Sequence, residues 1–173
     1  MLVRSIGLFW REDCVYWGSG NKAGTLLGVP FNAKTSEPVD FRDQIGIYAL
    51  YADYQLVYVG QAGSGEQTMF ARLKQHRKND LAGRWNRFSW FGVLRALGDG
   101  RLSSKREALH PKLPDVLNHI EAILIHSSEP PMNGQGGRFG EKVTRYQQVR
   151  DSRLGPSTHE MLRALCNSQR IQL

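Results

Sequence analysis

The chain of 173 residues is long enough to form one domain with a buried core that needs no disulfide or metal to fold. Lysine and arginine number 23 against 16 aspartate and glutamate residues, and the formal net charge of +7 favours a polyanionic partner such as nucleic acid. No apolar run approaches the roughly 18 residues that a membrane span needs. Cys14 and Cys166 lack any metal-ligand spacing, so we expect reduced thiols, no membrane insertion and a cytoplasmic location.

The first half of the chain predicts one strand or hairpin arm, one β-hairpin and one helix. Residues 8–17 combine aromatic and β-branched side chains, whereas residues 18–40 are rich in Gly, Pro, Asn and Ser and indicate an irregular connection. Two alternating apolar runs, at residues 45–51 and 56–60, flank a polar tip and predict the hairpin. A flexible loop then leads into a helix over residues 66–79.

The second half predicts a third strand and two more helices. Residues 88–94 are apolar and aromatic, and a polar, basic stretch separates them from a helix that begins near Pro114, a favourable first-turn residue. Residues 127–140 are rich in Pro and Gly and indicate a loop, and residues 157–167 predict a final helix. Three strands with helices between and after them indicate an α+β domain.

The predicted hairpin places four notable residues on one face. If its turn is centred on Asp53, Tyr48 lies opposite Tyr58 and Gly46 lies opposite Gly60. Side chains alternate along a strand, so the two phenols stand beside a notch that no side chain fills. That arrangement suits a phosphate better than an apolar core.

The tripeptides Gly-Ile-Tyr at residues 46–48 and Tyr-Val-Gly at residues 58–60 resemble the two motifs that give the GIY-YIG nuclease superfamily its name. The resemblance covers residues 45–135 and implies a catalytic core there, built on a small, mainly antiparallel three-stranded central sheet flanked by helices. Residues 1–44 would then form an N-terminal strand and loop extension. Residues 136–173 would form a basic, helical C-terminal extension of the same single domain.

Tyr48 of the first tripeptide and two later residues that match the family in order and spacing carry implied chemical roles. Arg72 would clamp the scissile phosphate, because its planar fork binds two oxygens. Glu121 would hold one Mg²⁺ or Mn²⁺ ion, and Tyr48 would act as the general base. In a helix, Glu121 has Leu117 and Ile125 at its i±4 positions and no basic partner, although a carboxylate at the edge of an apolar face that points to water is the alternative.

Three further residues complete the site that the resemblance implies. Tyr58 would contact phosphate, His76 would contact phosphate or relay a proton, and Asn133 would orient the site from its loop. Each also has an ordinary interpretation. Tyr48 and Tyr58 are also consistent with core tyrosines, Arg72 and His76 with the solvated face of a basic helix, and Asn133 with turn chemistry.

Candidate nucleic-acid contacts surround these positions. Some relatives carry a lysine just after the second tripeptide, where this chain has Gln61, and Lys74 is a candidate substitute. An aromatic group with interleaved arginines, at residues 84–91, suits either base stacking or a core with arginines at its edge. The candidate contacts are Gly46, Gly60, Gln61, Lys74, Arg84 and Arg87.

The expected function is metal-dependent endonuclease cleavage of nucleic acid, with DNA as the first substrate and RNA as an alternative. A non-cleaving nucleic-acid-binding or interaction module on the same fold is the rival hypothesis. Replacing Glu121 by Gln is expected to remove cleavage. Because the chain carries no separate recognition domain, a homodimer, a partner protein or weak specificity is expected.

Overall fold

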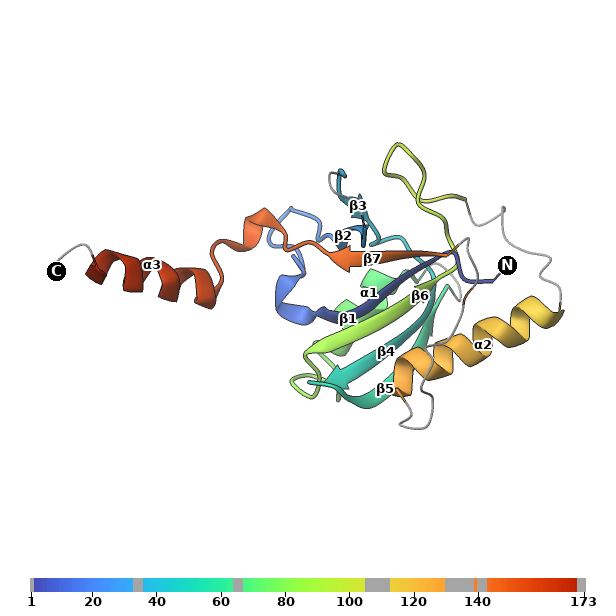
Figure 1. Cartoon of the computed structure of the whole chain (residues 1–173). Helices are drawn as coiled ribbons and strands as arrows, with labels where there is room; N and C mark the ends of the chain where they lie inside the picture. Colours follow the sequence, from blue (N-terminus) through green and yellow to red (C-terminus); the bar gives the residue numbers. More distant parts are fainter. Residues whose placement is uncertain are drawn as a thin grey trace.

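The computed structural model describes residues 2–32, 36–63, 67–104, 113–129, 139 and 143–170. Within these residues the chain forms one seven-stranded mixed sheet in the order β3-β2-β7-β1-β6-β4-β5, with three α-helices (Figure 1). The strands are β1 (Ser5–Arg11), β2 (Leu27–Pro30), β3 (Val39–Asp40), β4 (Gly46–Ala52), β5 (Gln55–Ala62), β6 (Arg87–Gly92) and β7 (Thr144–Gln148). The helices are α1 (Met69–His76), α2 (Leu113–Ser128) and α3 (Thr158–Arg170).

The predicted three-stranded central sheet is wrong, because strands from both ends of the chain extend it. The antiparallel group β5-β4-β6 is present, but β1 pairs with β6 and takes a central position. β7 pairs with β1 in parallel, and β2 and β3 continue the sheet beyond β7. The parts assigned to N- and C-terminal extensions therefore belong to the same sheet as the hairpin. Strands β2 and β3 are too short to show an alternating pattern, and β7 is too polar to show one.

The predicted register of the hairpin is also wrong, by two residues. Ala52 pairs with Gln55, which leaves a two-residue loop, and the pairing shifts again between Leu50 and Tyr51. Tyr48 therefore lies opposite Gly60, and Gly46 lies opposite Ala62. A shift of two residues preserves the alternation of side chains, so Tyr48, Tyr58 and Gly60 still share one face.

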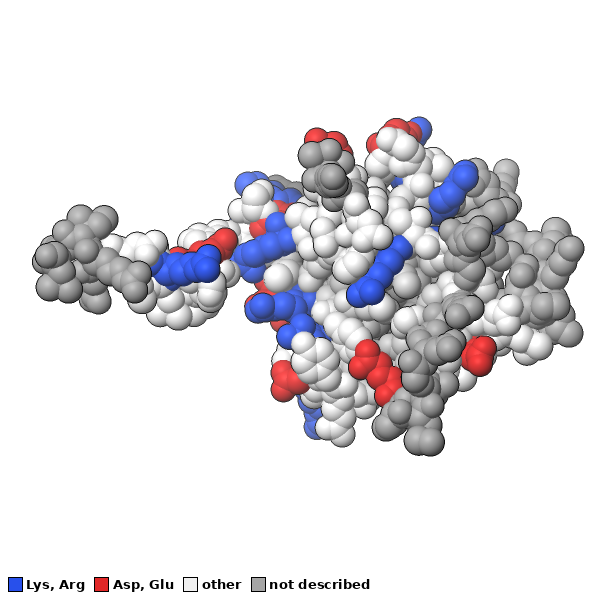
Figure 2. Space-filling view, viewed as in Figure 1, with Lys and Arg blue, Asp and Glu red and all other residues white. Residues whose placement is uncertain are grey.

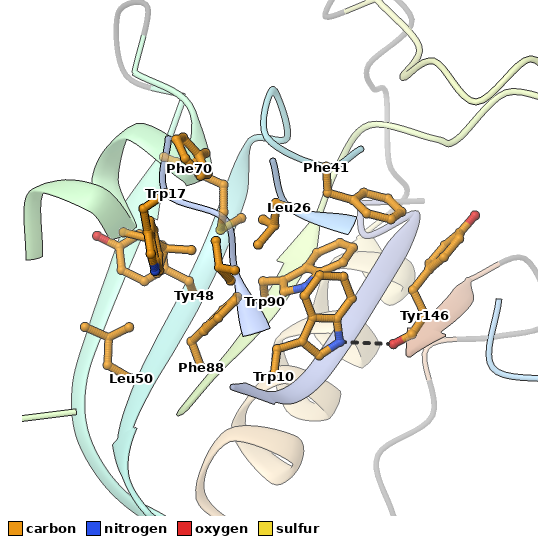
Figure 3. Close-up of a cluster of buried hydrophobic side chains, with 14 of the residues drawn as sticks. Trp10, Trp17, Leu26, Phe41, Tyr48, Leu50, Phe70, Phe88, Trp90 and Tyr146 are labelled. Atoms are coloured by element: carbon orange, nitrogen blue, oxygen red, sulfur yellow. Dashed lines mark hydrogen bonds between the residues drawn. The ribbon is translucent and has the colours of Figure 1, made fainter. Parts of the chain in front are cut away.

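The first face of the sheet is covered by α1 and by residues from the connections between β1 and β4, such as Trp17, Leu26 and Phe41. Figure 3 shows this cluster, in which Tyr48 and Leu50 of β4 pack in one layer with aromatic rings of β1 and β6. Fully buried members include Trp10, Leu26, Phe41, Tyr48, Leu50, Met69, Leu73, Phe88 and Trp90. The Thr68 side chain accepts a hydrogen bond from the Ala71 amide and caps α1, which fixes where the helix begins.

The opposite face is covered by α2, which lies in front of β4 and β5 in Figure 1. Ala122 and Ile123 of α2 pack in a second buried cluster with Ile6 and Phe91, and Ile47 of β4 packs against it. The Tyr51 hydroxyl donates to the Ser127 carbonyl at 3.0 Å and ties β4 to the end of α2. The described part of the molecule thus has three layers, with the sheet between α1 and α2.

The aromatic group at residues 84–91 belongs to the core. Trp85, Phe88, Trp90 and Phe91 are all buried, with exposures of 6%, 0%, 0% and 1%. The core interpretation is therefore confirmed, and these rings are not available to stack bases.

The last helix, α3, extends away from the body of the molecule (Figure 1). Its start is a capping box, in which the Ser157 hydroxyl accepts from the Glu160 amide and the Glu160 carboxylate accepts from the Ser157 amide. Cys14 and Cys166 are both free. Among the described residues, no helix combines the length and apolar character needed to cross a bilayer.

Candidate functional site

The hairpin and α1 bring four of the predicted site residues together. The Tyr48 hydroxyl and His76 Nε2 are 2.7 Å apart, and the ring of Tyr58 lies 4.9 Å from the ring of His76, centroid to centroid. The rings of Tyr48 and Tyr58 are 6.2 Å apart. Arg72 lies one turn before His76 on α1, and its guanidinium interacts electrostatically with the phenols of Tyr48 and Tyr58. We call Tyr48, Tyr58, Arg72 and His76 the hairpin–helix cluster.

Gly60 allows Tyr48 to reach this position. A Cβ atom at Gly60 would overlap the Tyr48 hydroxyl and would lie 2.8 Å from Cε1 of Tyr58. The notch predicted beside the two phenols is therefore filled by the Tyr48 ring itself. In Figure 3 the Tyr48 hydroxyl lies at the outer edge of the hydrophobic cluster, next to α1.

Gly46 serves the sheet rather than a ligand. Its φ of 144° is a conformation that other residues rarely adopt, and a Cβ atom there would overlap the Phe91 carbonyl oxygen. Gly46 therefore allows β4 and β6 to approach each other closely.

Arg72 is half-buried, and one donor of its guanidinium has no hydrogen-bond partner among the described residues. One terminal nitrogen, Nη1, donates to Gln75 Oε1 at 3.0 Å and to Gln67 Oε1 at 3.3 Å. Its Nε is buried and has no hydrogen-bond partner among the described residues. A buried donor without a partner is costly, so an oxygen acceptor that reached Nε would be stabilised there.

The ionisation of the cluster is set by burial and by Arg72. Burial raises the pKa of Tyr48, while the hydrogen bond and positive charge of Arg72 act in the opposite direction. Burial also lowers the pKa of His76, and Arg72 lowers it further. The resting cluster at neutral pH therefore contains a neutral phenol, a neutral imidazole and a guanidinium cation.

Asn79 is part of this site, although the sequence did not single it out. Its Nδ2 lies 3.1 Å from His76 Nδ1, and its Oδ1 accepts from the Leu81 amide at 3.0 Å. Asparagine three residues after a candidate histidine is common turn chemistry, so no sequence signal marks it.

Glu121 is not brought to the hairpin–helix cluster. It is exposed on α2, whose neighbouring residues Ala122 and Ile123 pack on the opposite face of the sheet from Tyr48. The carboxylate thus takes the alternative position, pointing to water at the edge of the apolar face. Asn133 lies outside the described residues.

The remaining candidate contacts are dispersed. Gln61 pairs with Ile47, so its exposed side chain lies on the α2 face, and Arg87 packs there over the ring of Tyr54 at 4.7 Å. Lys74 is half-buried on α1, with its amine 5.9 Å from the centre of the Phe70 ring, and Arg84 is exposed in the turn after α1. Lys74 and Arg84 therefore stay close in sequence to the cluster, whereas Gln61 and Arg87 do not point towards it.

Several charged groups next to α3 form contacts that hold the fold. Figure 2 shows lysine and arginine side chains gathered at the end of the body next to α3. Arg153 forms an ion pair with the buried Asp151, and Arg150 donates to the Asp13 carbonyl at 2.8 Å. A hollow of about 520 Å³ lies there, lined in part by Arg150 and Asp151, but its buried carboxylate is already bound by Arg153 and Thr25.

The described residues contain no group of three or more His, Cys, Asp or Glu side chains arranged to hold a metal ion. No family model, no curated protein and no solved structure matches the chain. The hairpin–helix cluster is therefore the basis on which a function can be proposed.

Proposed function

We propose that this protein binds nucleic acid at the hairpin–helix cluster and cleaves its phosphodiester bonds. The observation that carries the proposal is the convergence of two phenols, an imidazole and a guanidinium with an unused buried donor. Guanidinium and phenol groups are suitable donors to phosphate oxygens. The formal net charge of +7 supports a polyanionic partner.

In the proposed reaction, Tyr48 in its phenolate form takes a proton from the attacking water. The water oxygen forms a bond to phosphorus, one phosphorus–oxygen ester bond breaks, and the leaving oxygen takes a proton from solvent. Arg72 stabilises the charge that grows on the phosphoryl oxygens. The raised pKa of Tyr48 means that only a small fraction of the protein is in the reactive form at neutral pH.

The metal site expected at Glu121 does not fit this arrangement. A magnesium ion would need a carboxylate beside the phosphate that Tyr48 and Arg72 contact, whereas Glu121 lies on the helix that covers the other face of the sheet. We therefore assign no step to a metal on Glu121. Metal dependence is instead an outcome of the test below.

RNA is the second candidate substrate, and the composition of the cluster favours it. RNA carries its own nucleophile, the 2′-hydroxyl, which gives its proton to the Tyr48 phenolate and attacks the adjacent phosphorus. A 2′,3′-cyclic phosphate forms, the bond from phosphorus to the 5′ oxygen breaks, and that oxygen takes a proton from solvent. This reaction needs a proton acceptor and a cation, and Tyr48 and Arg72 supply them without a nearby carboxylate.

A binding module that does not cleave is the remaining alternative. It is favoured by the enclosure of Tyr48, whose side chain is fully buried in the resting structure. In that case the cluster would contact phosphate only through Arg72 and Tyr58, which are both half-buried.

The experiment uses end-labelled DNA and RNA strands of the same sequence, with Mg²⁺, with Mn²⁺ and with EDTA. The wild-type protein is compared with Tyr48→Phe, and Tyr51→Phe is the matched control because that buried tyrosine faces α2. Cleavage that Tyr48→Phe lowers and Tyr51→Phe does not supports the proposal. Binding of either strand without cleavage under any condition would contradict it and favour the binding module.

A further inference from the structure

We propose that Asn79 is a positioning residue that keeps the proton of His76 on Nε2, so that His76 donates a hydrogen bond to the Tyr48 oxygen. The geometry of the turn after α1 carries this inference. Its consequence for cleavage rests on the proposed function, whereas the position of the proton does not.

The orientation of the Asn79 amide follows from its two partners. Its oxygen, Oδ1, accepts from the Leu81 amide at 3.0 Å, in a turn where the side chain bonds to the backbone two residues later. A backbone N–H can only donate, so the oxygen must face Leu81. The Nδ2 group then faces His76 Nδ1 at 3.1 Å.

The protonation of His76 follows from the orientation of Asn79. An amide NH₂ group only donates, so Nδ1 of His76 accepts and carries no proton. A neutral imidazole has one proton, which is therefore on Nε2. Nε2 lies 2.7 Å from the Tyr48 hydroxyl oxygen, and His76 is only 3% exposed, which keeps water from competing for this bond.

The resulting chain of hydrogen bonds prepares Tyr48 for proton transfer. In this arrangement the Tyr48 oxygen accepts a hydrogen bond from Nε2 of His76. The hydroxyl hydrogen of Tyr48 therefore does not point at Nε2. Donors aimed at a phenol oxygen also favour the phenolate form, and the positive charge of Arg72 acts in the same direction on the pKa of Tyr48. Asn79 thus acts on Tyr48 through His76, without contacting substrate.

Asn79→Asp is the sharpest variant, because it reverses one hydrogen bond and keeps the other. One carboxylate oxygen can still accept from the Leu81 amide, so the turn is retained. The second oxygen cannot donate, so it requires a proton on Nδ1 of His76. Nε2 then carries no proton and accepts a hydrogen bond from the Tyr48 hydroxyl, which favours the neutral phenol.

The first measurement is the position of the His76 proton by long-range ¹H–¹⁵N nuclear magnetic resonance at about pH 8, where histidine with an ordinary pKa near 6.5 is neutral. His76→Gln identifies the signals. We expect Nε2–H in the wild-type protein and protonated Nδ1 in Asn79→Asp. The Nδ1 of His119 accepts from the Val3 amide at 2.9 Å, so His119 should remain Nε2–H in both proteins. A wild-type His76 with its proton on Nδ1, or no change in Asn79→Asp, would overturn the inference.

The second measurement is cleavage by the same proteins under single-turnover conditions. Asn79→Asp should lower the cleavage rate at least tenfold with little change in substrate binding, as expected when a histidine is held in the wrong tautomer. Asn118→Asp, the same change at an exposed position on α2, should have no effect. A shifted His76 proton with an unchanged rate would overturn the role of Asn79 in cleavage. If the wild-type protein does not cleave, the proposed function fails, while the resonance result still decides where the proton lies.

Discussion

Two tyrosines of β4 have the same burial and opposite surroundings. Tyr48 and Tyr51 are both fully buried, and burial raises the pKa of each. The Tyr51 hydroxyl faces α2 and donates its proton to the Ser127 carbonyl. The Tyr48 hydroxyl faces α1 and meets a histidine nitrogen, with Arg72 close by.

This difference separates a structural tyrosine from a candidate catalytic one. The Tyr51 hydroxyl uses its only proton to join β4 to α2. The Tyr48 oxygen lies within hydrogen-bond distance of His76 Nε2. The cation nearby, Arg72, has a buried Nε without a hydrogen-bond partner among the described residues. Equal burial thus says little about function, and the partners of the hydroxyl decide it.

Removing the cation should produce the largest effect. Arg72→Ala is expected to lower the cleavage rate by about 10²–10³-fold, the usual cost of removing one donor that stabilises charge in a transition state. Arg101→Ala is the control, because that exposed arginine pairs with Asp99 outside the cluster. Equal rates for the two variants would place the chemistry away from α1.

The dependence of the rate on pH should distinguish the two tyrosines further. Burial raises the pKa of Tyr48 above its ordinary value near 10. If phenolate is the base, the rate should rise about tenfold for each pH unit between about pH 7 and pH 9. The same slope should persist in Tyr51→Phe and vanish in Tyr48→Phe. A flat profile in the wild-type protein would remove the general-base role.

Filling the space beside Tyr48 should destabilise the fold. In Gly60→Ala the new methyl group overlaps the Tyr48 hydroxyl, and overpacking of this kind costs about 1–3 kcal/mol. Urea denaturation measures the change in the free energy of unfolding. Gly98→Ala is the control, because a Cβ atom at Gly98 meets nothing within 4 Å. A neutral Gly60→Ala would show that Tyr48 does not occupy the space above β5.

Acid should weaken the fold through His76, the smallest of these effects. Burial lowers the pKa of His76 below its unfolded value, and Arg72 adds to the shift. At His76 the unfolded chain therefore binds a proton more readily than the folded protein does. The contribution of neutral His76 to the free energy of unfolding is thus complete above the unfolded pKa and is lost as the pH falls below it. Urea denaturation at about pH 7 and about pH 5 should show a smaller loss in His76→Gln than in the wild-type protein. His159→Gln, at an exposed position on α3, should behave as the wild type. An unchanged loss in His76→Gln would contradict the assignment.

The parts of the site that are close in sequence could be predicted, because local geometry fixes them. A hairpin puts alternate residues of two neighbouring strands on one face whatever the exact turn, so Tyr48 and Tyr58 met even though the register was wrong by two residues. Arg72 and His76 lie one turn apart on the helix that follows the hairpin, so both side chains lie beside Tyr48 and Tyr58.

The parts that depend on long-range packing could not be predicted. The apolar run around Glu121 indicates a helix, but not which face of the sheet that helix covers. Strand β1 has polar and apolar residues in no simple alternation, since it is central and buried on both sides. Asn79 depends on a turn whose backbone conformation is not visible in the sequence.

The central claim is that the chemistry lies on the α1 face, and single-turnover cleavage by three variants tests it most directly. The variants are Tyr48→Phe, Tyr51→Phe and Glu121→Gln, each with its fold checked by circular dichroism. We predict that Tyr48→Phe loses about a hundredfold in rate, while Tyr51→Phe and Glu121→Gln cleave as the wild type does. Loss of cleavage in Glu121→Gln with normal cleavage in Tyr48→Phe would contradict the account and return the site to α2.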